Sequence, residues 1–251
     1  MQAYNQGFAQ VYDLRWSGFA KQVAPLILDF YAGTPTGRKN KAVLDLCCGT
    51  GHLSLHFLEK GYKIVGIDLS KPMLAQAEER TRKYLASGQA RFIQGDASHF
   101  SLAERFGLVV STFDSLNHLK NERALRRCID CVHAICEGYF IFDLNTKSGL
   151  KRWNSITVDE FSEEALIITH GMYDGQGDKA WTRITGFIQN QNGLFERFDE
   201  TVYNTVFKLK SVRDMLVEAG WKKVYFARIQ NLKVPVDEPE KESRIFIVAK
   251  T

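Results

Sequence analysis

The sequence contains little of what defines fibrous, membrane-spanning or nucleic-acid-binding proteins. Its 251 residues include only five prolines, which excludes a proline-rich or collagen-like chain. The apolar runs, such as Tyr139-Phe140-Ile141-Phe142, are far shorter than the roughly 20 residues of a spanning helix. Lys and Arg exceed Asp and Glu by only four, 33 against 29, too small an excess to indicate DNA or RNA binding. These absences leave an ordinary globular protein.

The cysteines point to a reducing compartment. The chain has five, an odd number, and Cys47 and Cys48 are adjacent, which is a poor basis for a disulfide framework. The first twenty residues also lack the basic start and apolar block of a secretory signal. We therefore expect a soluble, cytoplasmic protein.

Short apolar runs alternate with helical periodicity over most of the chain. Such runs are typical of strands buried on both faces, and the intervening helices make consecutive strands parallel. The last two strands have no helix between them and are expected to form an antiparallel edge hairpin. The pattern predicts a doubly wound α/β fold with a mostly parallel seven-stranded sheet, its strands near 42–46, 64–67, 91–93, 108–113, 139–144, 223–229 and 244–249.

Two segments depart from this pattern. Residues 1–38 carry apolar side chains at helical spacing and predict an N-terminal helical lid. Residues 151–208 alternate polar and apolar side chains between Gly- and Asn-rich turns, which predicts an inserted antiparallel β cap. Its strands are expected at 165–170, 181–188 and 195–206. Residues 39–150 and 209–251 then form the core, where Ser211 is expected to cap the last helix.

A glycine-containing loop is the strongest functional signal. Gly49 and Gly51 lie between a buried strand and a helix, where the backbone can approach a ligand and the helix offers unpaired N–H groups. The next strand ends in Asp68, a residue placed to accept hydrogen bonds from both hydroxyls of a ribose. A dinucleotide and S-adenosylmethionine both remain open at this point, although Ser54 stands where a dinucleotide loop needs Gly or Ala.

Motifs at four successive strand ends resemble those of the class I S-adenosylmethionine-dependent methyltransferases. They are Asp45-x-Cys47-x-Gly49-x-Gly51, Gly66-Ile67-Asp68-Leu69-Ser70, Gly95-Asp96-Ala97 and Val110–Leu119. The resemblance covers about residues 41–144 and implies a Rossmann-like fold with S-adenosylmethionine as cofactor. In one departure, Cys47 stands where the fullest form of the motif has its first glycine.

The resemblance also implies which residues hold the cofactor. The loop after Asp45 would hold the methionine moiety, Asp68 the ribose, and Asp96 the adenine amino group. Tyr4, Tyr12 and Trp16 belong to a segment that folds over the cofactor in the resembled enzymes, where an aromatic face would stabilise the sulfonium. The residues expected to bind the cofactor are Tyr12, Asp45, Cys47, Gly49, Thr50, Gly51, Asp68, Leu69, Met73, Asp96, Ala97 and Thr112.

The loop after the fourth strand carries the candidate catalytic residues Asn117 and His118, to which Tyr12 is added from the lid. His118 has the pKa range to take a proton from a nucleophile, but it could instead cap the following helix. The loop lacks Asn/Asp-Pro-Pro-Tyr, which argues against the amino groups of nucleic-acid bases as acceptors. It resembles the loop of small-molecule methyltransferases, including sugar-amine N-dimethyltransferases and glycine/sarcosine-type enzymes.

We therefore expect methyl transfer to nitrogen or oxygen of a small-molecule acceptor, with no nucleic acid, membrane or metal involved. The acceptor is expected against Trp181, Arg183 and Tyr203 of the inserted sheet, although solvent exposure is the commoner fate of a residue like Arg183. Three other functions stay open: an RNA-modifying methyltransferase, a binding protein without catalysis and an NAD-dependent oxidoreductase. The oligomeric state is also open, a homodimer included. Zinc is not expected, because the four candidate ligands lie on one helical segment and cannot converge: Cys128, Cys131, His133 and Cys136.

Overall fold

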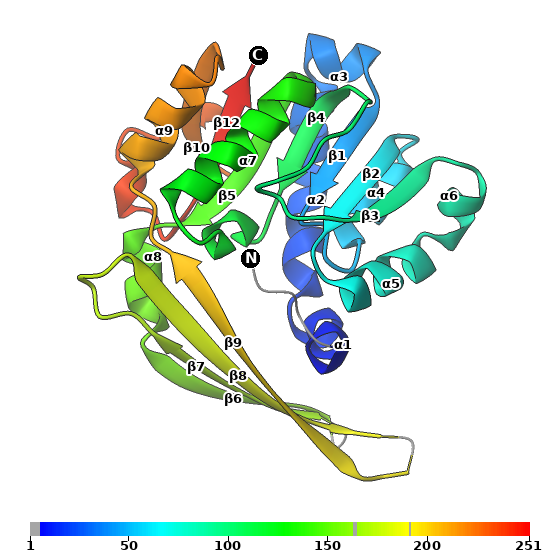
Figure 1. The fold of residues 1–251 in the computed structure, drawn as a ribbon, viewed down its shortest axis with the longest axis vertical. Coiled ribbons are helices and arrows are strands. Elements are labelled where there is room, and N and C mark those ends of the chain that lie inside the picture. The colour runs from blue at the N-terminus through cyan, green and yellow to red at the C-terminus, as the bar shows by residue number, and fades with distance from the viewer. Residues whose placement is uncertain (1–5, 163–164, 191) are drawn as a thin grey trace.

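The computed structural model describes residues 6–162, 165–190 and 192–251, which form two sheets of unequal size (Figure 1). The larger has eight strands in the order β11-β10-β12-β5-β4-β1-β2-β3, and the smaller has four in the order β6-β7-β8-β9. Residues 1–5 of the expected lid, with Tyr4, lie outside the described residues. Within the described ranges, no helix has both the length and the apolar character needed to cross a bilayer.

The large sheet is the mostly parallel α/β sheet that the sequence predicts, with one strand added at its edge. Strands β1 to β5 are parallel. The last two predicted strands, β10 and β12, pair antiparallel as expected, but β11 lies between them in the chain, so they do not form a simple edge hairpin. Strand β12 also runs antiparallel to β5. The added strand is β11, which pairs with β10. The strands are β1 (Ala42–Leu46), β2 (Lys63–Asp68), β3 (Ala90–Gln94), β4 (Phe106–Ser111), β5 (Cys136–Asn145), β10 (Lys223–Arg228), β11 (Asn231–Pro235) and β12 (Arg244–Lys250).

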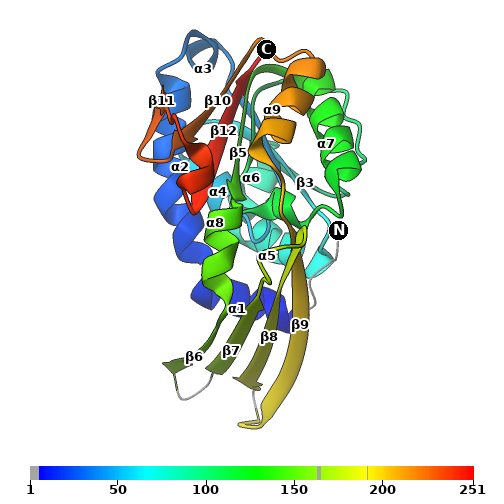
Figure 2. The ribbon, with the colours of Figure 1, turned by 90° about the vertical axis from the view of Figure 1, so that its left-hand side faces the viewer.

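Helices cover both faces of the large sheet (Figure 2). Apolar residues of α7 (Glu122–Ile135) and α9 (Leu209–Glu218) pack on one face, and those of α2 (Ser17–Ala32) and α4 (His52–Glu59) pack on the other. Burial of these faces is the main source of stability. The remaining helices are α1 (Gln6–Arg15), α3 (Pro35–Lys39), α5 (Lys71–Arg80), α6 (Arg82–Ala86), α8 (Lys147–Leu150) and three short 3₁₀ turns at Ser115–His118, Lys151–Trp153 and Pro239–Lys241.

Two helix starts are satisfied in different ways. Ser70 caps α5, since its hydroxyl accepts a hydrogen bond from the Met73 N–H. The predicted cap at Ser211 is wrong, because α9 begins two residues earlier. The first N–H of that helix, at Leu209, donates instead to the Glu240 carboxylate at 3.0 Å. That partner lies about thirty residues away, which local spacing cannot reveal.

The small sheet is an antiparallel meander that includes one strand not individually expected. Its strands are β6 (Ser155–Ser162), β7 (Ala165–Met172), β8 (Lys179–Gln189) and β9 (Phe195–Thr205). Helix α1 lies between this sheet and α5 (Figure 1). The apolar side of α1 packs against residues of both neighbours in one buried cluster: Phe8, Ala9, Val11, Met73, Ile167, Ile184 and Val202.

Candidate functional site

A cavity of about 330 Å³ lies where the carboxyl ends of β1 and β2 meet α1 and the small sheet. Ligands of open α/β sheets bind at this edge because the strand ends and helix N-termini converge there. Of the residues predicted from the sequence, Tyr12, Cys47, Gly49, Asp68, Leu69, Met73 and His118 line the cavity. Asp45, Thr50, Gly51, Asp96, Ala97, Thr112 and Asn117 do not.

Backbone strain is concentrated around the cavity. Three non-glycine residues of the described chain have positive φ, namely Cys47 (62°), Phe113 (65°) and Asp114 (47°), and all three line it. Such conformations cost free energy in residues other than glycine and tend to persist at functional sites. For Cys47, the left-handed backbone explains why glycine would suit this position.

Asp68 is held in place by the loop it faces. Its carboxylate accepts hydrogen bonds from the backbone N–H groups of Gly49 (2.8 Å) and Ser70 (2.9 Å). Burial raises the pKa of this carboxyl above its ordinary value, although the two N–H donors act in the opposite direction. The group is therefore oriented toward the cavity and ready to accept hydroxyl hydrogen bonds.

Asp45 lies behind the cavity lining. It is 2% exposed and accepts a 2.6 Å hydrogen bond from the Ser54 hydroxyl. Burial, with a further contribution from the nearby Asp68, raises the pKa of Asp45 to about 7. Asp45 does not line the cavity, and its bond to Ser54 ties β1 to the start of α4.

Thr50 and Gly51 shape the loop from beneath. The Thr50 hydroxyl donates to Asp13 of α1 at 2.6 Å, which links the loop to the helix that covers it. Gly51 has φ of 79°, and a Cβ at this position would lie 2.9 Å from the Cβ of Ala77 in α5. Only glycine allows α4 and α5 to approach this closely.

Three other predicted cofactor residues lie near this edge but outside the cavity. Asp96 accepts from the backbone N–H and hydroxyl of Ser98, at 2.7 and 2.8 Å, and despite partial burial these bonds lower its pKa below the ordinary value. Ala97 is buried in the core. Thr112 uses its carbonyl to accept from the Ser115 hydroxyl at 2.7 Å, which shapes the loop after β4.

His118 and Tyr12 both line the cavity. The Nδ1 atom of His118 lies 3.0 Å from the Tyr203 carbonyl, so in the neutral ring Nδ1 carries the proton and Nε2 the lone pair. Tyr12 packs edge-on against Phe113, with ring centroids 6.0 Å apart. Burial, reinforced by nearby carboxylates, raises the pKa of Tyr12 far above its ordinary value, so its hydroxyl keeps its proton at neutral pH.

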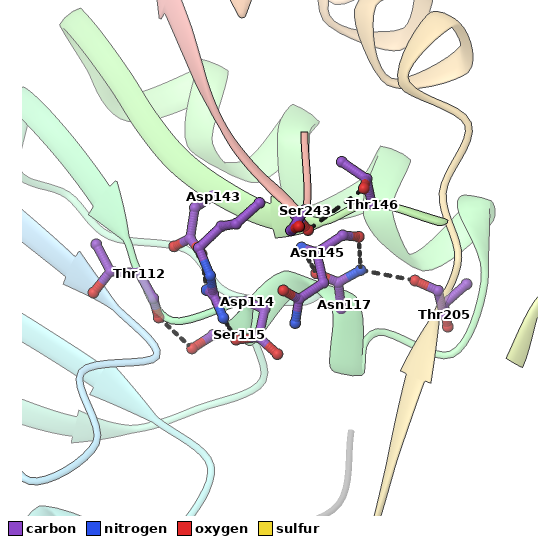
Figure 3. Close-up of polar contacts among 10 residues, drawn as sticks. Thr112, Asp114, Ser115, Asn117, Asp143, Asn145, Thr146, Thr205 and Ser243 are labelled. Atoms are coloured by element: carbon purple, nitrogen blue, oxygen red, sulfur yellow. Dashed lines mark hydrogen bonds and ion pairs between the residues drawn. The ribbon is translucent and has the colours of Figure 1, made fainter. Parts of the chain in front are cut away.

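The catalytic role predicted for Asn117 is not supported by its position. Asn117 is completely buried, and its amide group donates to the carbonyls of Asn145 (3.2 Å) and Thr205 (2.9 Å) and accepts from the Asn145 N–H (2.9 Å). Figure 3 shows it between these two residues. Asn145 is likewise buried outside the cavity. Asn117 therefore joins β5, the 3₁₀ turn and β9, and its chemistry is structural.

A charge cluster that the sequence does not predict lies next to the loop after β4. Arg244 at the start of β12 forms ion pairs with Asp114 (2.7 Å) and with Asp143 at the end of β5. Asp143 also accepts from the Asp114 N–H at 2.9 Å, so it holds the strained backbone directly (Figure 3). The guanidinium stacks over Phe19 and Phe113. These partners are separated by up to 130 positions, and no local motif connects them.

The small sheet turns a different face to the cavity from the one predicted. Thr182, Ile184, Val202 and Asn204 line the cavity, whereas Trp181, Arg183 and Tyr203 do not. Arg183 pairs with the exposed Asp199 on the outer face. A shift of one residue reverses the faces of a strand, and the sequence does not determine this register.

The described residues contain no group of three or more His, Cys, Asp or Glu side chains placed to hold a metal ion. The four side chains considered for zinc are partly accounted for by packing, because Cys128 and Cys136 are buried in the core of the large sheet. A thiol in such surroundings behaves as a small apolar group.

The chain is similar to known methyltransferases. Residues 43–136 match a family model described as a methyltransferase domain. A protein of Bacillus subtilis (strain 168) that is provisionally named a methyltransferase is 27% identical over 86% of this chain and 85% of its own. The dTDP-3-amino-3,4,6-trideoxy-alpha-D-glucopyranose N,N-dimethyltransferase of Streptomyces venezuelae is 35% identical over 49% of each chain.

A solved structure has the same fold over nearly the whole length. It is an S-adenosylmethionine-dependent methyltransferase from Clostridium acetobutylicum ATCC 824, with a TM-score of 0.79, 23% identity, and 97% of each chain covered. At this identity the likeness speaks for the fold, including the second, four-stranded sheet.

Proposed function

Because this chain belongs to the class I S-adenosylmethionine-dependent methyltransferases, we propose that it methylates nitrogen or oxygen of a small-molecule acceptor. The observation that carries the proposal is the single cavity that joins Asp68 and the glycine loop to the inner face of the small sheet. Relatives named for the N,N-dimethylation of amino sugars favour nitrogen. The oxidoreductase alternative is excluded by the family.

The residues present fit the cofactor. Asp68, fixed by two backbone donors, would accept from the ribose hydroxyls, and the cavity-lining Leu69 and Met73 would pack on the adenine. Asp96, further along the same edge, would receive the adenine amino group, and the left-handed loop at Cys47 and Gly49 would hold the methionine moiety. When bound, the cofactor supplies an electrophilic methyl group on a sulfonium.

The chain's own contribution is positioning, water exclusion and proton removal. His118 would accept a proton from the attacking nitrogen or oxygen on Nε2, while its Nδ1–H stays bonded to the Tyr203 carbonyl. Tyr12, whose hydroxyl remains protonated, would present its ring to the positive charge. Helix α2 packs on the large sheet as part of the core, so we assign the lid function to α1 alone.

We also propose that the protein works in a reducing compartment such as the cytoplasm. All five cysteines are free thiols, and Cys128 and Cys136 are buried where oxidation would disturb the core.

Calorimetry with S-adenosylmethionine tests the assignment of the site. Asp68→Asn should weaken cofactor binding roughly ten- to hundredfold, since a hydrogen bond to a charged group contributes about 1.5–3 kcal/mol. Asp130→Asn, at an exposed position on α7, is the matched control and should bind as the wild type does. Equal affinity in both variants would remove Asp68 from the site.

A product assay tests the reaction. Wild-type protein incubated with S-adenosylmethionine and a panel of small amines and alcohols should release S-adenosylhomocysteine, and His118→Ala should lower kcat roughly a hundredfold without changing cofactor affinity. Release that depends on transfer RNA, and on no small molecule, would favour the RNA-modifying alternative instead.

A further inference from the structure

The inner face of the small sheet carries polar atoms that the protein leaves without hydrogen bonds. The hydroxyls of Thr169 and Thr182 and the side-chain oxygen of Asn204 are each buried and have no partner. They come from three successive strands, β7, β8 and β9, and all three residues line the cavity. Buried polar atoms are nearly always paired, so three on one wall call for a partner from outside the protein.

The strand register gives Thr182 and Asn204 no polar side chain directly opposite them in the sheet. Thr182 lies opposite Gly171 on one side and Val202 on the other, and neither offers a polar side-chain atom. Asn204 lies opposite Ala180. Thr169 lies opposite Ile184 on β8 and opposite the exposed Thr157 on β6, but its hydroxyl makes no hydrogen bond. The apolar neighbours Ile184 and Val202 are 4% and 9% exposed and form a continuous surface beside the polar atoms. The wall therefore combines hydrogen-bonding groups with an apolar floor.

The charges around the cavity do not favour an acceptor that carries an acidic group. Arg244 is already neutralised by Asp114 and Asp143. Arg152, the other arginine of the lining, is exposed. The buried wall itself offers two hydroxyls and a carboxamide, which are uncharged and match hydroxyl or amine groups better than a carboxylate.

We propose that Thr169, Thr182 and Asn204 determine acceptor specificity by binding an acceptor that carries several hydroxyl groups and no acidic group. This proposal rests on the proposed methyl transfer and names its substrate class. The hydroxyls of the acceptor pair with the three side chains, and its carbon skeleton packs on Ile184 and Val202. The reacting atom is then held toward His118, whose Nδ1 lies 3.0 Å from the carbonyl of Tyr203, the residue before Asn204 in β9.

The first experiment separates recognition from structure. Thr182→Val and Asn204→Leu keep shape while removing the polar atoms. Because these atoms have no partner in the protein, the Tm of the ligand-free variants should stay the same or rise, and the affinity for S-adenosylmethionine should not change. Thr201→Val, at a position opposite Arg183 on the outer face, is the matched control. A fall in Tm for both cavity variants, with Thr201→Val unchanged, would show that these groups serve the fold and would overturn the proposal.

The second experiment measures binding of defined probes to protein saturated with S-adenosylhomocysteine. Glucosamine should bind more tightly than 2-aminocyclohexanol, and both more tightly than cyclohexylamine or glycine, with roughly a three- to tenfold loss for each hydroxyl contact removed. Thr182→Val and Asn204→Leu should reduce the differences in affinity among these four probes, and Thr201→Val should leave the differences unchanged. Equal binding of cyclohexylamine, tighter binding of glycine, or no binding of any hydroxylated amine overturns the proposal.

The two proposals fail in different ways. If the hydroxyl preference is seen but no S-adenosylhomocysteine is produced from any amine or alcohol, the proposed methyl transfer fails and the recognition wall stands. If product forms from cyclohexylamine as readily as from glucosamine, the transfer stands and the wall does not select hydroxyls.

Discussion

At the scale of single residues, two neighbouring strand ends carry carboxylates with different tasks. Asp68 faces the cavity and accepts two backbone N–H groups, while Asp45 is buried behind it with the Ser54 hydroxyl. Burial raises the pKa of both carboxyls, and the charge of Asp68 adds to the rise at Asp45, because two negative charges at short range in a buried site repel. The Asp68 carboxylate is thus available to a ligand, whereas the buried Asp45 lowers the free energy of unfolding by an amount that depends on pH.

This cost predicts how stability changes with pH. Asp45 has an ordinary pKa of 3.8 and a folded-state pKa of about 7, so the folded protein holds its proton more tightly. The contribution of this group is therefore most favourable below about pH 4, declines as the pH rises toward 7, and is constant above that. Asp45→Asn keeps an acceptor for Ser54 without the charge. The free energy of unfolding of the variant should exceed that of the wild type at pH 8 by on the order of 2–4 kcal/mol, since each tenfold change in proton affinity is worth about 1.4 kcal/mol.

Urea denaturation of both proteins between pH 4.5 and pH 8 measures this difference. Asp68 titrates in both proteins, so the difference between them reports the titration of Asp45 together with its repulsion by Asp68. A difference that does not change with pH would mean that Asp45 is ionised throughout the range and that its burial has little effect.

At the scale of elements, the loop after β4 is held by charges that come from β5 and β12. Asp143 accepts from the strained backbone at Asp114, and Arg244 pairs with both carboxylates. Burial of Asp143 raises its pKa even though Arg244 opposes this. The three side chains form one unit, and the loss of the cation would leave two carboxylates in a low-dielectric site.

Arg244→Met should therefore lower the free energy of unfolding by roughly 3–5 kcal/mol at pH 7. The triple variant Arg244→Met, Asp114→Asn, Asp143→Asn removes the uncompensated charges and should recover most of this loss. Arg91→Met breaks the exposed pair with Glu104, whose side chains are about half exposed, and should cost less than about 1 kcal/mol. Chemical denaturation compares the four proteins, and a triple variant no more stable than Arg244→Met would show that packing, not charge, dominates.

The same elements show what the sequence can and cannot predict. The core strands and the glycine loop follow from local periodicity and from the Gly49 and Asp68 positions, which need no tertiary information. Strand β11 was not predicted because it is a five-residue edge strand with little burial. The face of the small sheet was predicted wrongly because period-two alternation in half-buried strands does not say which side is covered. The Arg244 cluster and the bonds of Asn117 join distant segments, so only the fold reveals them.

At the scale of the whole molecule, α1 connects the two sheets around the cavity. Its apolar side packs on α5 and the small sheet. Asp13, the residue after Tyr12, links α1 to the glycine loop. Asp13 accepts from the Thr50 hydroxyl at 2.6 Å, lies 3.1 Å from His52 and pairs with Arg80 of α5. Burial acts to raise the pKa of Asp13, but these partners lower it below the ordinary value. We call Asp13, Thr50 and Arg80 the latch; its carboxylate therefore stays charged at every pH near neutrality.

Loosening this latch should change how long the cofactor stays bound. Asp13→Asn removes the ion pair with Arg80 and weakens the link to Thr50, so α1 should open more often. We expect the dissociation rate of S-adenosylmethionine to rise roughly tenfold, since a hydrogen bond to a charged group is worth about 1.5–3 kcal/mol, and hydrogen exchange of α1 to accelerate while exchange in α9 stays the same. Asp214→Asn, which breaks the exposed pair with Lys210 on α9, is the control. Unchanged release and exchange in Asp13→Asn would mean that the packing of Phe8 and Val11 alone holds the lid, and that the latch only shapes the loop beneath it.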